Sequence, residues 1–329
     1  MSLLKVDELK TYYTTLRGAV KAVDSVSFTV EKGEATGLAG ESGCGKTTVA
    51  SSILRILPSN GRIIGGKILY KSSIDIARLD EEVMRTDIRW KEISIVFQGA
   101  MNAMNPVFKV GDQIVEAITL HEPGVSRKEA LDRAQKLMEL VGVEPSRVNN
   151  YPHEFSGGMK QRAMIAMALA SNPSLFIADE PATALDVIVA AQVLKLLKEL
   201  KTKLGLGMIL ITHDLSIIAE LCEKAVIMYA GKIAECGDVV AVFKKPMHPY
   251  TQGLMGSFPS IDAKERMRMV SIPGTPPDLL SPPTGCRFHT RCKFAMDVCK
   301  KEEPAFMELE KGHYVSCHLV MALYEGKKW

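Results

Sequence analysis

Residues 40–48 form a glycine-rich loop of a kind that binds phosphate. They match the pattern G-x-x-x-x-G-K-[ST] and read Gly40-Glu41-Ser42-Gly43-Cys44-Gly45-Lys46-Thr47-Thr48. In such a loop several backbone N–H groups surround phosphate oxygens, and the helix that follows adds the positive end of its dipole. Lys46 would reach the β- and γ-phosphates, and the Thr47 hydroxyl would ligate Mg²⁺. The loop predicts that this chain binds a nucleoside triphosphate.

Two carboxylates follow an apolar segment later in the chain. Residues 175–178 read as a buried strand, and Asp179 and Glu180 come directly after it. Ligands bind at the carboxyl ends of parallel strands, so both acids would face the phosphates. Asp179 suits Mg²⁺, directly or through water, and Glu180 suits a general base for the attacking water. Taken alone, the pair equally fits a surface feature at the end of a strand.

A second glycine-containing segment lies between these two motifs. Ser156, Gly157 and Gly158 precede a helix expected over residues 159–170. Their N–H groups would make another anion site at a helix start. A helical insertion separates the two glycine sites, so one monomer cannot easily use both on the same nucleotide.

Four of the seven cysteines crowd into the last part of the chain, at Cys286, Cys292, Cys299 and Cys317. Four thiolates can enclose Zn²⁺ or a [4Fe–4S] cluster. The paired C-x2-C knuckles of zinc ribbons are missing, so the spacing by itself favours neither metal. An intracellular nucleotide enzyme keeps its thiols reduced, which argues against a disulfide framework.

The elements that must position these residues alternate between strands and helices. Residues 3–13 and 20–30 alternate like strands, and residues 99–152 have helical character. Ser126 and Glu129 form a capping box before a helix expected over 127–141. Further strands are expected at 35–39, 62–70, 92–97, 175–178, 208–212 and 225–229, and helices at 47–57, 187–204 and 215–221. This pattern predicts an α/β fold with helices on the faces of a parallel sheet.

Length and composition limit the other possibilities. A chain of 329 residues can hold about two domains, and its prolines beyond residue 245 indicate a small, loop-rich extension. The formal net charge of +3 is too small to favour a nucleic acid as partner. We expect neither a signal peptide nor a membrane span, so any membrane role would come through a partner subunit.

The segment Phe155-Ser156-Gly157-Gly158-Met159-Lys160-Gln161-Arg162 resembles the signature sequence of the ATP-binding-cassette (ABC) ATPases. Other elements of that family follow in order: Gln98 after a strand, Ala184-Leu185-Asp186 after Glu180, and Thr212-His213-Asp214. The resemblance covers residues 3–240 almost continuously. Met159 stands where the signature usually has glutamine, and the Ser-Gly-Gly donors are unchanged.

The resemblance implies a P-loop NTPase (ABC ATPase) core with an N-terminal antiparallel β subdomain. The ATPase domain would span residues 1–244, with a helical subdomain at about 99–172, and the loop-rich C-terminal extension residues 245–329. It also implies a head-to-tail dimer, in which the signature of one subunit closes on the ATP γ-phosphate held by the other.

Several residue roles follow from the same resemblance. His213 would contact the γ-phosphate from its own subunit, and Gln98 would sense Mg²⁺ and the attacking water. Asp186, the last residue of the family element Ala184-Leu185-Asp186, is also expected to contact the nucleotide. Tyr13 is the candidate for stacking on adenine, and Tyr12 is a second candidate for the same role. The alternative for either tyrosine is a purely structural position in the core or at the edge of the sheet.

The C-terminal extension resembles that of oligopeptide and dipeptide importer ATPases, some of which carry an iron–sulfur cluster there. We therefore expect a [4Fe–4S] cluster on the four cysteines, with a structural role and with zinc as the alternative. The implied partners are a second ATPase subunit that is a different chain, two transmembrane permease subunits and an extracellular substrate-binding protein, with this chain on the cytoplasmic face of the membrane.

The expected activity is ATP hydrolysis that powers import of peptides. Nickel and oligosaccharide importers use closely similar ATPases, so either solute is an alternative. A soluble ABC ATPase without a transport role is another reading, although the second cassette, long coiled coil or basic linker of that class is not seen. A redox-sensing regulator that binds ATP would rest on the cysteines alone.

Overall fold

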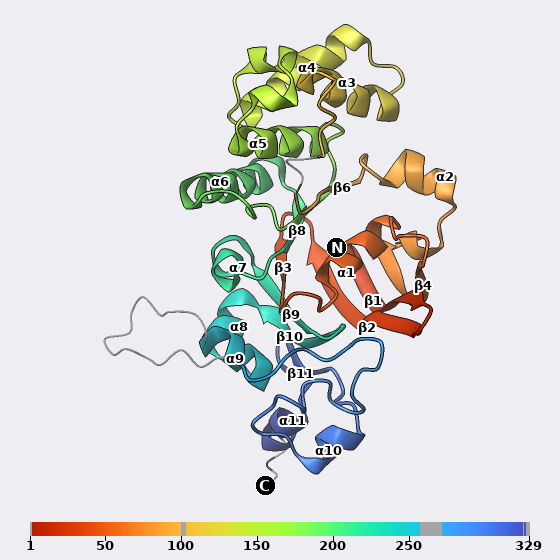
Figure 1. Ribbon diagram of the computed structural model, residues 1–329, viewed down its shortest axis with the longest axis vertical. Coiled ribbons are helices and arrows are strands. Elements are labelled where there is room, and N and C mark those ends of the chain that lie inside the picture. Colours follow the sequence, from red (N-terminus) through yellow and green to blue (C-terminus); the bar gives the residue numbers. More distant parts are fainter. Residues whose placement is uncertain (1, 100–102, 257–271, 325, 327–329) are drawn as a thin grey trace. The chain divides into compact units, whose positions relative to one another are not determined.

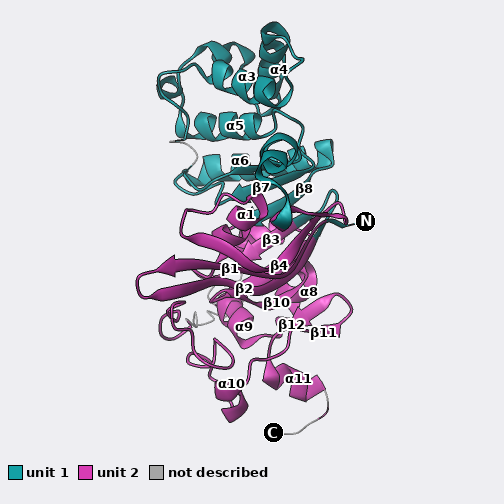
Figure 2. Cartoon of the chain, turned by 90° about the vertical axis from the view of Figure 1, so that its right-hand side faces the viewer, with its two compact units in different colours: residues 1–3, 30–35, 78–211 teal, residues 4–29, 36–77, 212–329 magenta. Residues whose placement is uncertain are grey.

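A computed structural model describes residues 2–99, 103–256, 272–324 and 326. The chain divides into two compact units, which are coloured separately in Figure 2. The first unit comprises residues 1–3, 30–35 and 78–211, and the second comprises residues 4–29, 36–77 and 212–329. Both sides of the expected domain boundary at residue 244 fall in the second unit, and the division into residues 1–244 and 245–329 stays a prediction.

Three parallel strands form the centre of the first unit. They are β6 (Ile93–Val96), β7 (Leu175–Asp179) and β8 (Gly207–Ile211), and every residue in them is buried. Ile93 pairs with Leu175, and Leu175 pairs with Gly207. Strands that read as continuous apolar runs are typical of a parallel sheet covered on both faces.

Most of the remaining elements of the first unit are helices, in agreement with the helical insertion predicted from the sequence (Figure 1). Ser126 caps the helix that begins at Arg127 through its hydroxyl, which accepts a hydrogen bond from the Glu129 N–H at 3.2 Å. The helices are α2 (Glu81–Val83), which continues into a π turn (Met84–Ile88), α3 (Val110–His121), α4 (Arg127–Leu140), α5 (Gly157–Ala168) and α6 (Val187–Leu204), with 3₁₀ turns at Pro145–Asn149 and Pro152–Glu154.

An antiparallel sheet begins the second unit, as the alternating pattern of the N-terminal sequence predicts. Its strands lie in the order β2-β1-β4-β5. In β1, Leu4, Val6 and Leu9 are fully buried, which accounts for the alternation. The strands are β1 (Ser2–Thr15), β2 (Gly18–Glu31), β4 (Gly61–Tyr70) and β5 (Ile74–Asp75), followed by a 3₁₀ turn at Ile76–Arg78.

A second sheet in the same unit carries the phosphate loop. Here β3 (Ala35–Ala39) pairs in parallel with β9 (Lys224–Tyr229), and β9 pairs antiparallel with β10 (Lys232–Asp238). A hairpin of β11 (Met307–Glu310) and β12 (His313–Val315) continues the sheet beyond β10. The C-terminal extension therefore adds two short strands to a sheet of the second unit.

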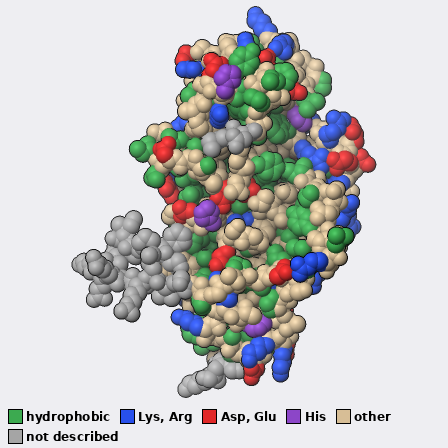
Figure 3. Space-filling view, viewed as in Figure 1, with side chains coloured by type: hydrophobic (Ala, Val, Ile, Leu, Met, Phe, Trp, Pro, Cys, Tyr) green, Lys and Arg blue, Asp and Glu red, His purple; other side chains and the backbone are tan. Residues whose placement is uncertain are grey.

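The helices of the second unit are short. They are α1 (Lys46–Leu54), α7 (Leu215–Leu221), α8 (Val239–Lys244), α9 (Pro249–Gly256), α10 (Asp297–Lys301) and α11 (His318–Tyr324). Within the part of the chain that the structure describes, no helix is both long and apolar enough to cross a membrane. On the face drawn in Figure 3, basic and acidic side chains are interspersed, in keeping with the small net charge.

Candidate nucleotide-binding site

The phosphate loop connects the end of β3 to the start of α1, as the sequence predicts. Three of its glycines have positive φ: 145° at Gly40, 78° at Gly43 and 108° at Gly45. A Cβ on Gly40 would lie 2.1 Å from the Met228 carbonyl oxygen, and one on Gly45 would lie 2.2 Å from that of Ala22. Backbone atoms at these distances cannot give way, so the loop requires glycine at both positions.

Lys46 lies over the loop that precedes it. Its side chain is buried, and its ammonium donates hydrogen bonds to the carbonyl oxygens of Gly40 at 2.7 Å and Glu41 at 3.1 Å. Ser42 and Thr47 are exposed on the same loop. A cation, exposed hydroxyls and a helix start are thereby gathered in one short segment, which suits an anionic ligand.

The two N-terminal tyrosines have different surroundings. The Tyr13 hydroxyl is 3.1 Å from the Thr48 hydroxyl in the first turn of α1, which brings Tyr13 to the loop. Tyr12 instead donates to an Asp24 carboxylate oxygen at 2.8 Å. Burial and this hydrogen bond raise the pKa of Tyr12 to about 12. Tyr13 is therefore the tyrosine that has a contact with the phosphate-loop helix.

Two residues that the sequence analysis did not single out contact the phosphate loop from the C-terminal extension. The Tyr250 hydroxyl accepts a hydrogen bond from the Glu41 N–H at 2.9 Å. Arg291 donates to both oxygens of the Glu41 carboxylate, at 2.6 and 2.9 Å. They lie 209 and 250 positions from Glu41 in the sequence, so no local motif could have indicated them.

His213 completes the predicted set in the second unit. It is exposed and lies in the turn before α7. The turn is held by Thr212, whose N–H donates to the Leu38 carbonyl at 3.2 Å, and by Asp214, whose carboxylate caps α7 at the Ser216 N–H. The His213 side chain is therefore exposed on a turn that backbone and capping hydrogen bonds hold in place.

The predicted acidic pair ends strand β7 in the first unit. Asp179 is fully buried, and Glu180 has a φ of 51°, a left-handed conformation that is uncommon outside glycine. The Glu180 N–H donates to the Ile211 carbonyl at 2.9 Å, and its carboxylate accepts from the Thr183 hydroxyl at 2.6 Å. Backbone strain of this kind gathers at functional sites, where the surrounding structure maintains it.

The predicted signature segment forms the start of α5. Ser156 caps this helix, since its hydroxyl accepts from the Met159 N–H at 3.3 Å, and Ser156 and Gly157 are exposed. Asp186 likewise caps α6 by accepting from the Val189 N–H at 3.0 Å. Gln98 is exposed two residues beyond the end of β6.

The predicted site residues thus form two groups. The phosphate loop, Tyr13 and His213 belong to the second unit, and Gln98, the signature segment, the acidic pair and Asp186 belong to the first. The group in the second unit presents an anion-binding loop, and the group in the first unit presents a strained carboxylate and a second helix start.

The four C-terminal cysteines are brought together, but the predicted [4Fe–4S] cluster, with zinc as its alternative, is wrong. Across residues 2–99, 103–256, 272–324 and 326, no group of three or more His, Cys, Asp or Glu side chains could hold a metal ion. All four line one cavity of about 10 Å³, with Phe288, Phe294 and Leu319 in its wall. That volume holds about one water molecule, so an iron–sulfur cluster does not fit.

Burial also affects the ionisation of these cysteines. It raises the pKa of Cys286 to about 12 and that of Cys317 to about 11, so both are thiols at neutral pH. The spacing of the cysteines suggested a metal centre because spacing cannot reveal how little room the side chains leave.

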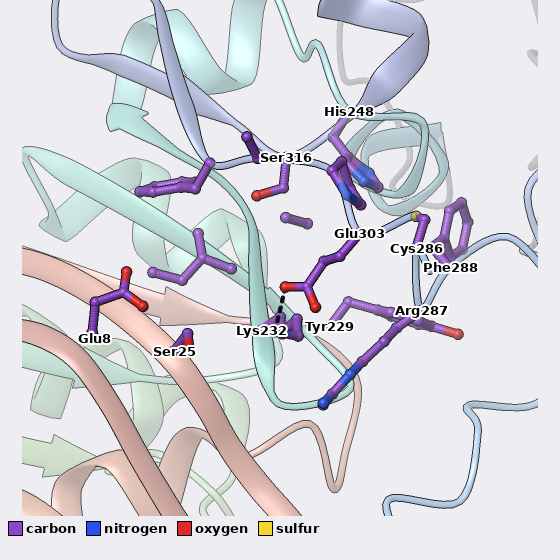
Figure 4. Close-up of a pocket in the computed structure, with 15 residues that line it drawn as sticks. Glu8, Ser25, Tyr229, Lys232, His248, Cys286, Arg287, Phe288, Glu303 and Ser316 are labelled. Carbon is purple, nitrogen blue, oxygen red and sulfur yellow. Dashed lines mark hydrogen bonds and ion pairs between the residues drawn. The ribbon is translucent and has the colours of Figure 1, made fainter. Parts of the chain in front are cut away.

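A larger pocket, of about 300 Å³, lies in the second unit (Figure 4). Glu8 and Ser25 from the N-terminal sheet line it together with Arg287, Phe288 and Glu303 from the C-terminal extension, and Lys232 pairs with Glu303 in its wall. Cys286 is the one predicted site residue in its lining, and no residue expected to bind nucleotide takes part.

Two protein-family descriptions match this sequence. The one described as "ABC transporter" matches residues 23–183. The one described as "Oligopeptide/dipeptide transporter, C-terminal region" matches residues 234–299. The two matches cover the phosphate loop, the signature segment and acidic pair, and the first three of the four C-terminal cysteines.

Curated relatives match almost the whole chain. A probable peptide ABC transporter ATP-binding protein of Sinorhizobium fredii is 45% identical, over 96% of this chain and 94% of its own. A dipeptide transport ATP-binding protein of Caldanaerobacter subterraneus is 41% identical, over 96% of this chain and 97% of its own. An oligopeptide transport ATP-binding protein of Bacillus subtilis is 44% identical, over 97% of this chain and 89% of its own.

Solved structures agree with the fold. A dimeric ATP-binding cassette in a post-hydrolysis state, bound to ADP and Pi, superposes with a TM-score of 0.64 at 25% identity, covering 72% of this chain and 98% of that one. A subunit of an ABC transporter complex from Clostridium perfringens gives a TM-score of 0.63 at 28% identity, covering 74% of this chain and 91% of its own. The predicted cassette fold is confirmed.

Proposed function

Because this chain belongs to the family of ABC transporter ATP-binding proteins, we propose that it is the ATP-hydrolysing subunit of an importer for dipeptides or oligopeptides. The observation that carries this function is its near full-length similarity to proteins named for peptide, dipeptide and oligopeptide transport. The match of residues 234–299 to the oligopeptide/dipeptide transporter C-terminal region supports the same substrate class.

The phosphate loop binds ATP in this proposal. The loop N–H groups and Lys46 hold the β- and γ-phosphates, and Tyr13 stacks on the adenine ring. Support comes from the positive φ of Gly40 and Gly45, from the buried Lys46 ammonium, and from the contact of Tyr13 with Thr48. Thr47 and Gln98, whose oxygens suit a hard cation, would hold Mg²⁺, which neutralises phosphate charge when bound.

Glu180 acts as the general base of hydrolysis. It takes a proton from the attacking water as the water oxygen bonds to the γ-phosphorus, and the bond from that phosphorus to the β–γ bridging oxygen breaks to leave ADP. The hydrogen bond from Thr183 and the strained backbone support this role because they fix the carboxylate. Asp179 would help to hold the Mg²⁺, and Gln98 and His213 would orient the water and the γ-phosphate.

The site requires a second ATPase subunit. The Ser156–Gly157–Gly158 segment closes on the ATP of a neighbouring cassette, and that cassette's segment closes on the ATP held here. The exposed helix start at Ser156 and Gly157 supports this arrangement, and similar cassettes have been solved as dimers. Following the resemblance of the C-terminal extension, the partner ATPase is a different chain.

The remaining partners are two transmembrane permease subunits and, through the complex, an extracellular substrate-binding protein. This chain lies on the cytoplasmic face of the membrane and contacts the permeases through the insertion at residues 99–115. Val107 and Phe108 support this surface, with 70% and 55% of their area exposed. Met101 and Met104 are two further apolar residues of this segment that were candidates for the same surface. Met104 is buried and does not contribute, and Met101 lies outside the described residues.

Uptake of a labelled dipeptide tests the importer role. Cells that lack this chain should lose uptake, and the parent chain should restore it. Lys46→Ala should not restore uptake, because ATP binding is lost. Lys67→Ala is the control, since this exposed lysine on β4 lies outside the loop.

Parallel assays separate the alternative substrates. Loss of nickel or oligosaccharide uptake with dipeptide uptake intact would replace the peptide assignment and keep the energy-coupling role. If deletion of this chain changes the uptake of none of these solutes, the chain belongs to the soluble, non-transport class of ABC ATPases.

A further inference from the structure

The C-terminal extension contacts Glu41 of the phosphate loop twice, once at its carboxylate and once at its backbone N–H. The Glu41 carboxylate accepts two hydrogen bonds from the guanidinium of Arg291, at 2.6 and 2.9 Å, while the Glu41 N–H donates to the Tyr250 hydroxyl at 2.9 Å. The Arg291 side chain is 4% exposed and that of Glu41 is 26% exposed. A two-pronged ion pair with a buried arginine is a strong and directional contact.

The two clamping residues are themselves fixed. The Arg291 Nε donates to the Pro273 carbonyl at 2.8 Å, and one of its terminal nitrogens lies 3.3 Å from the Tyr229 hydroxyl. Tyr250 is fully buried, and its ring centroid lies 4.7 Å from that of Tyr229 and 5.4 Å from that of Phe288. Tyr229 and Phe288 also line the pocket of Figure 4, where both are labelled.

Glu41 poses an electrostatic problem for a loop that binds phosphate. Its carboxylate belongs to the same short segment as Lys46, whose ammonium reaches the Glu41 carbonyl at 3.1 Å. A negative charge there would repel a triphosphate, and at a partly buried position the repulsion is weakly screened. Arg291 is the positive group that the structure places on this carboxylate.

We propose that Arg291 is a positioning residue of the ATP site, which cancels the Glu41 charge so that the loop can bind triphosphate, while Tyr250 fixes the Glu41 backbone. This inference rests on the proposed nucleotide site. It gives the C-terminal extension a direct influence on the affinity for ATP, in addition to the expected structural role. Loss of the arginine should weaken ATP binding because an uncompensated carboxylate remains.

The test compares Arg291→Gln, Arg291→Lys, Glu41→Gln and the double variant Glu41→Gln/Arg291→Gln in the full chain, which is assembled with its partner subunits for the hydrolysis measurements. The readouts are the Kd for a fluorescent ATP analogue and the KM and kcat of ATP hydrolysis. Arg291→Gln should raise Kd and KM about tenfold, with kcat within about twofold of the parent. A purely structural defect would instead lower kcat by reducing the active fraction and leave KM unchanged.

The other variants separate the effect of the Glu41 and Arg291 charges from the effect of side-chain geometry. Arg291→Lys should have an intermediate effect, because lysine keeps the charge and loses the fork geometry. Glu41→Gln should bind ATP within about threefold of the parent, and the double variant should recover most of the affinity that Arg291→Gln loses. Added salt should change the difference in Kd between Arg291→Gln and the parent only slightly, because charges at a partly buried position are weakly screened.

Arg287→Gln is the matched control. Arg287 is also a buried arginine of the C-terminal extension, and it pairs with Asp24 and the Ala230 carbonyl instead of with a loop residue. It should leave KM for ATP unchanged. An equal rise in KM in Arg287→Gln would show that general loosening of the extension is responsible and would overturn the inference.

The remaining outcomes are distinguishable. If the parent chain binds ATP, Lys46→Ala does not, and Arg291→Gln binds as the parent does, this inference alone fails. A Glu41→Gln variant that binds ATP about tenfold more weakly would also overturn it, and that variant needs no change at the arginine. If the parent itself binds no ATP, the proposed function fails.

Discussion

At the scale of single residues, the distinctive feature is Glu180, whose backbone has a left-handed conformation that residues other than glycine rarely adopt. Glu180 has positive φ, and its side chain is fixed by the Thr183 hydroxyl. Asp179, its neighbour, ends the buried strand β7. A general base must be held within reach of its proton, and rigid surroundings provide this.

Replacement of Glu180 by glutamine tests its role as general base. Glu180→Gln keeps the size and the hydrogen-bond acceptor but cannot take a proton, so kcat for ATP hydrolysis should fall by about 100-fold or more while ATP binding persists. Steady-state ATPase assays and nucleotide-binding titrations measure the two effects, and a stable ATP-bound dimer should accumulate. Glu199→Gln, on an exposed part of α6, is the control. Near-parental turnover in Glu180→Gln would remove this residue from the chemistry.

At the scale of elements, the contact between α5 and α6 depends on the absence of a side chain at Gly158. A Cβ at this position would lie 2.4 Å from a γ-carbon of Val189 near the start of α6. Valine has little freedom at χ1, so it cannot move away cheaply. The second glycine of the signature segment therefore has a packing role as well as its proposed role toward phosphate.

Gly158→Ala should lower the free energy of unfolding by about 1–3 kcal/mol, as overpacking does. Adding Val189→Ala should restore most of that loss, because the clashing methyl group is removed. Chemical denaturation of the single and double variants gives both values. Gly124→Ala is the control, since a Cβ there meets nothing within 4 Å. If the double variant is no more stable than Gly158→Ala, the contact with Val189 does not explain the requirement.

At the scale of the whole molecule, buried polar contacts attach the C-terminal extension to the rest of the second unit. Glu235 of β10 is fully buried and accepts hydrogen bonds from the N–H groups of Met247 and His248, both at 2.9 Å, and from the His313 ring at 2.7 Å. Arg287 makes a buried ion pair with Asp24 of β2. Groups of this kind are costly to separate, because each would leave a buried charge uncompensated.

His248 makes the stability depend on pH. Burial lowers the pKa of His248 to about 4, although the nearby Glu235 charge acts in the opposite direction. Its ordinary value is 6.5, so between pH 6.5 and 4 the unfolded chain binds a proton that the folded chain does not. Acidification through this range should reduce the free energy of unfolding by about 1.4 kcal/mol per pH unit from this group.

Urea denaturation at pH 7, 6 and 5 measures this dependence. His248→Asn keeps an acceptor for the Tyr250 N–H, which donates to the ring at 2.9 Å in the parent, but it does not titrate. The variant should therefore lose less stability than the parent as the pH falls. His153→Asn, at an exposed histidine, should follow the parent. Equal pH slopes for His248→Asn and the parent would contradict the assignment.

The sequence by itself determined the features that depend on neighbouring residues. The loop at 40–48, the acidic pair at the end of β7 and the helix cap at Ser126 were readable because a loop, a strand end or a helix cap is fixed by a few consecutive side chains. The α/β class followed from the order of the elements, and the similarity of the whole chain to peptide-transport ATPases agrees with the resemblance seen in its motifs.

Only the tertiary structure decided which residues that are far apart in the sequence contact one another. The contacts of Arg291 and Tyr250 with Glu41 join residues 250 and 209 positions apart, and no spacing rule predicts them. The same limit produced the error over the cysteines, whose spacing permits a metal centre although, within the described residues, they belong to no group that could hold a metal ion. Burial and distance in space are set by packing, which the order of residues constrains only through the complete fold.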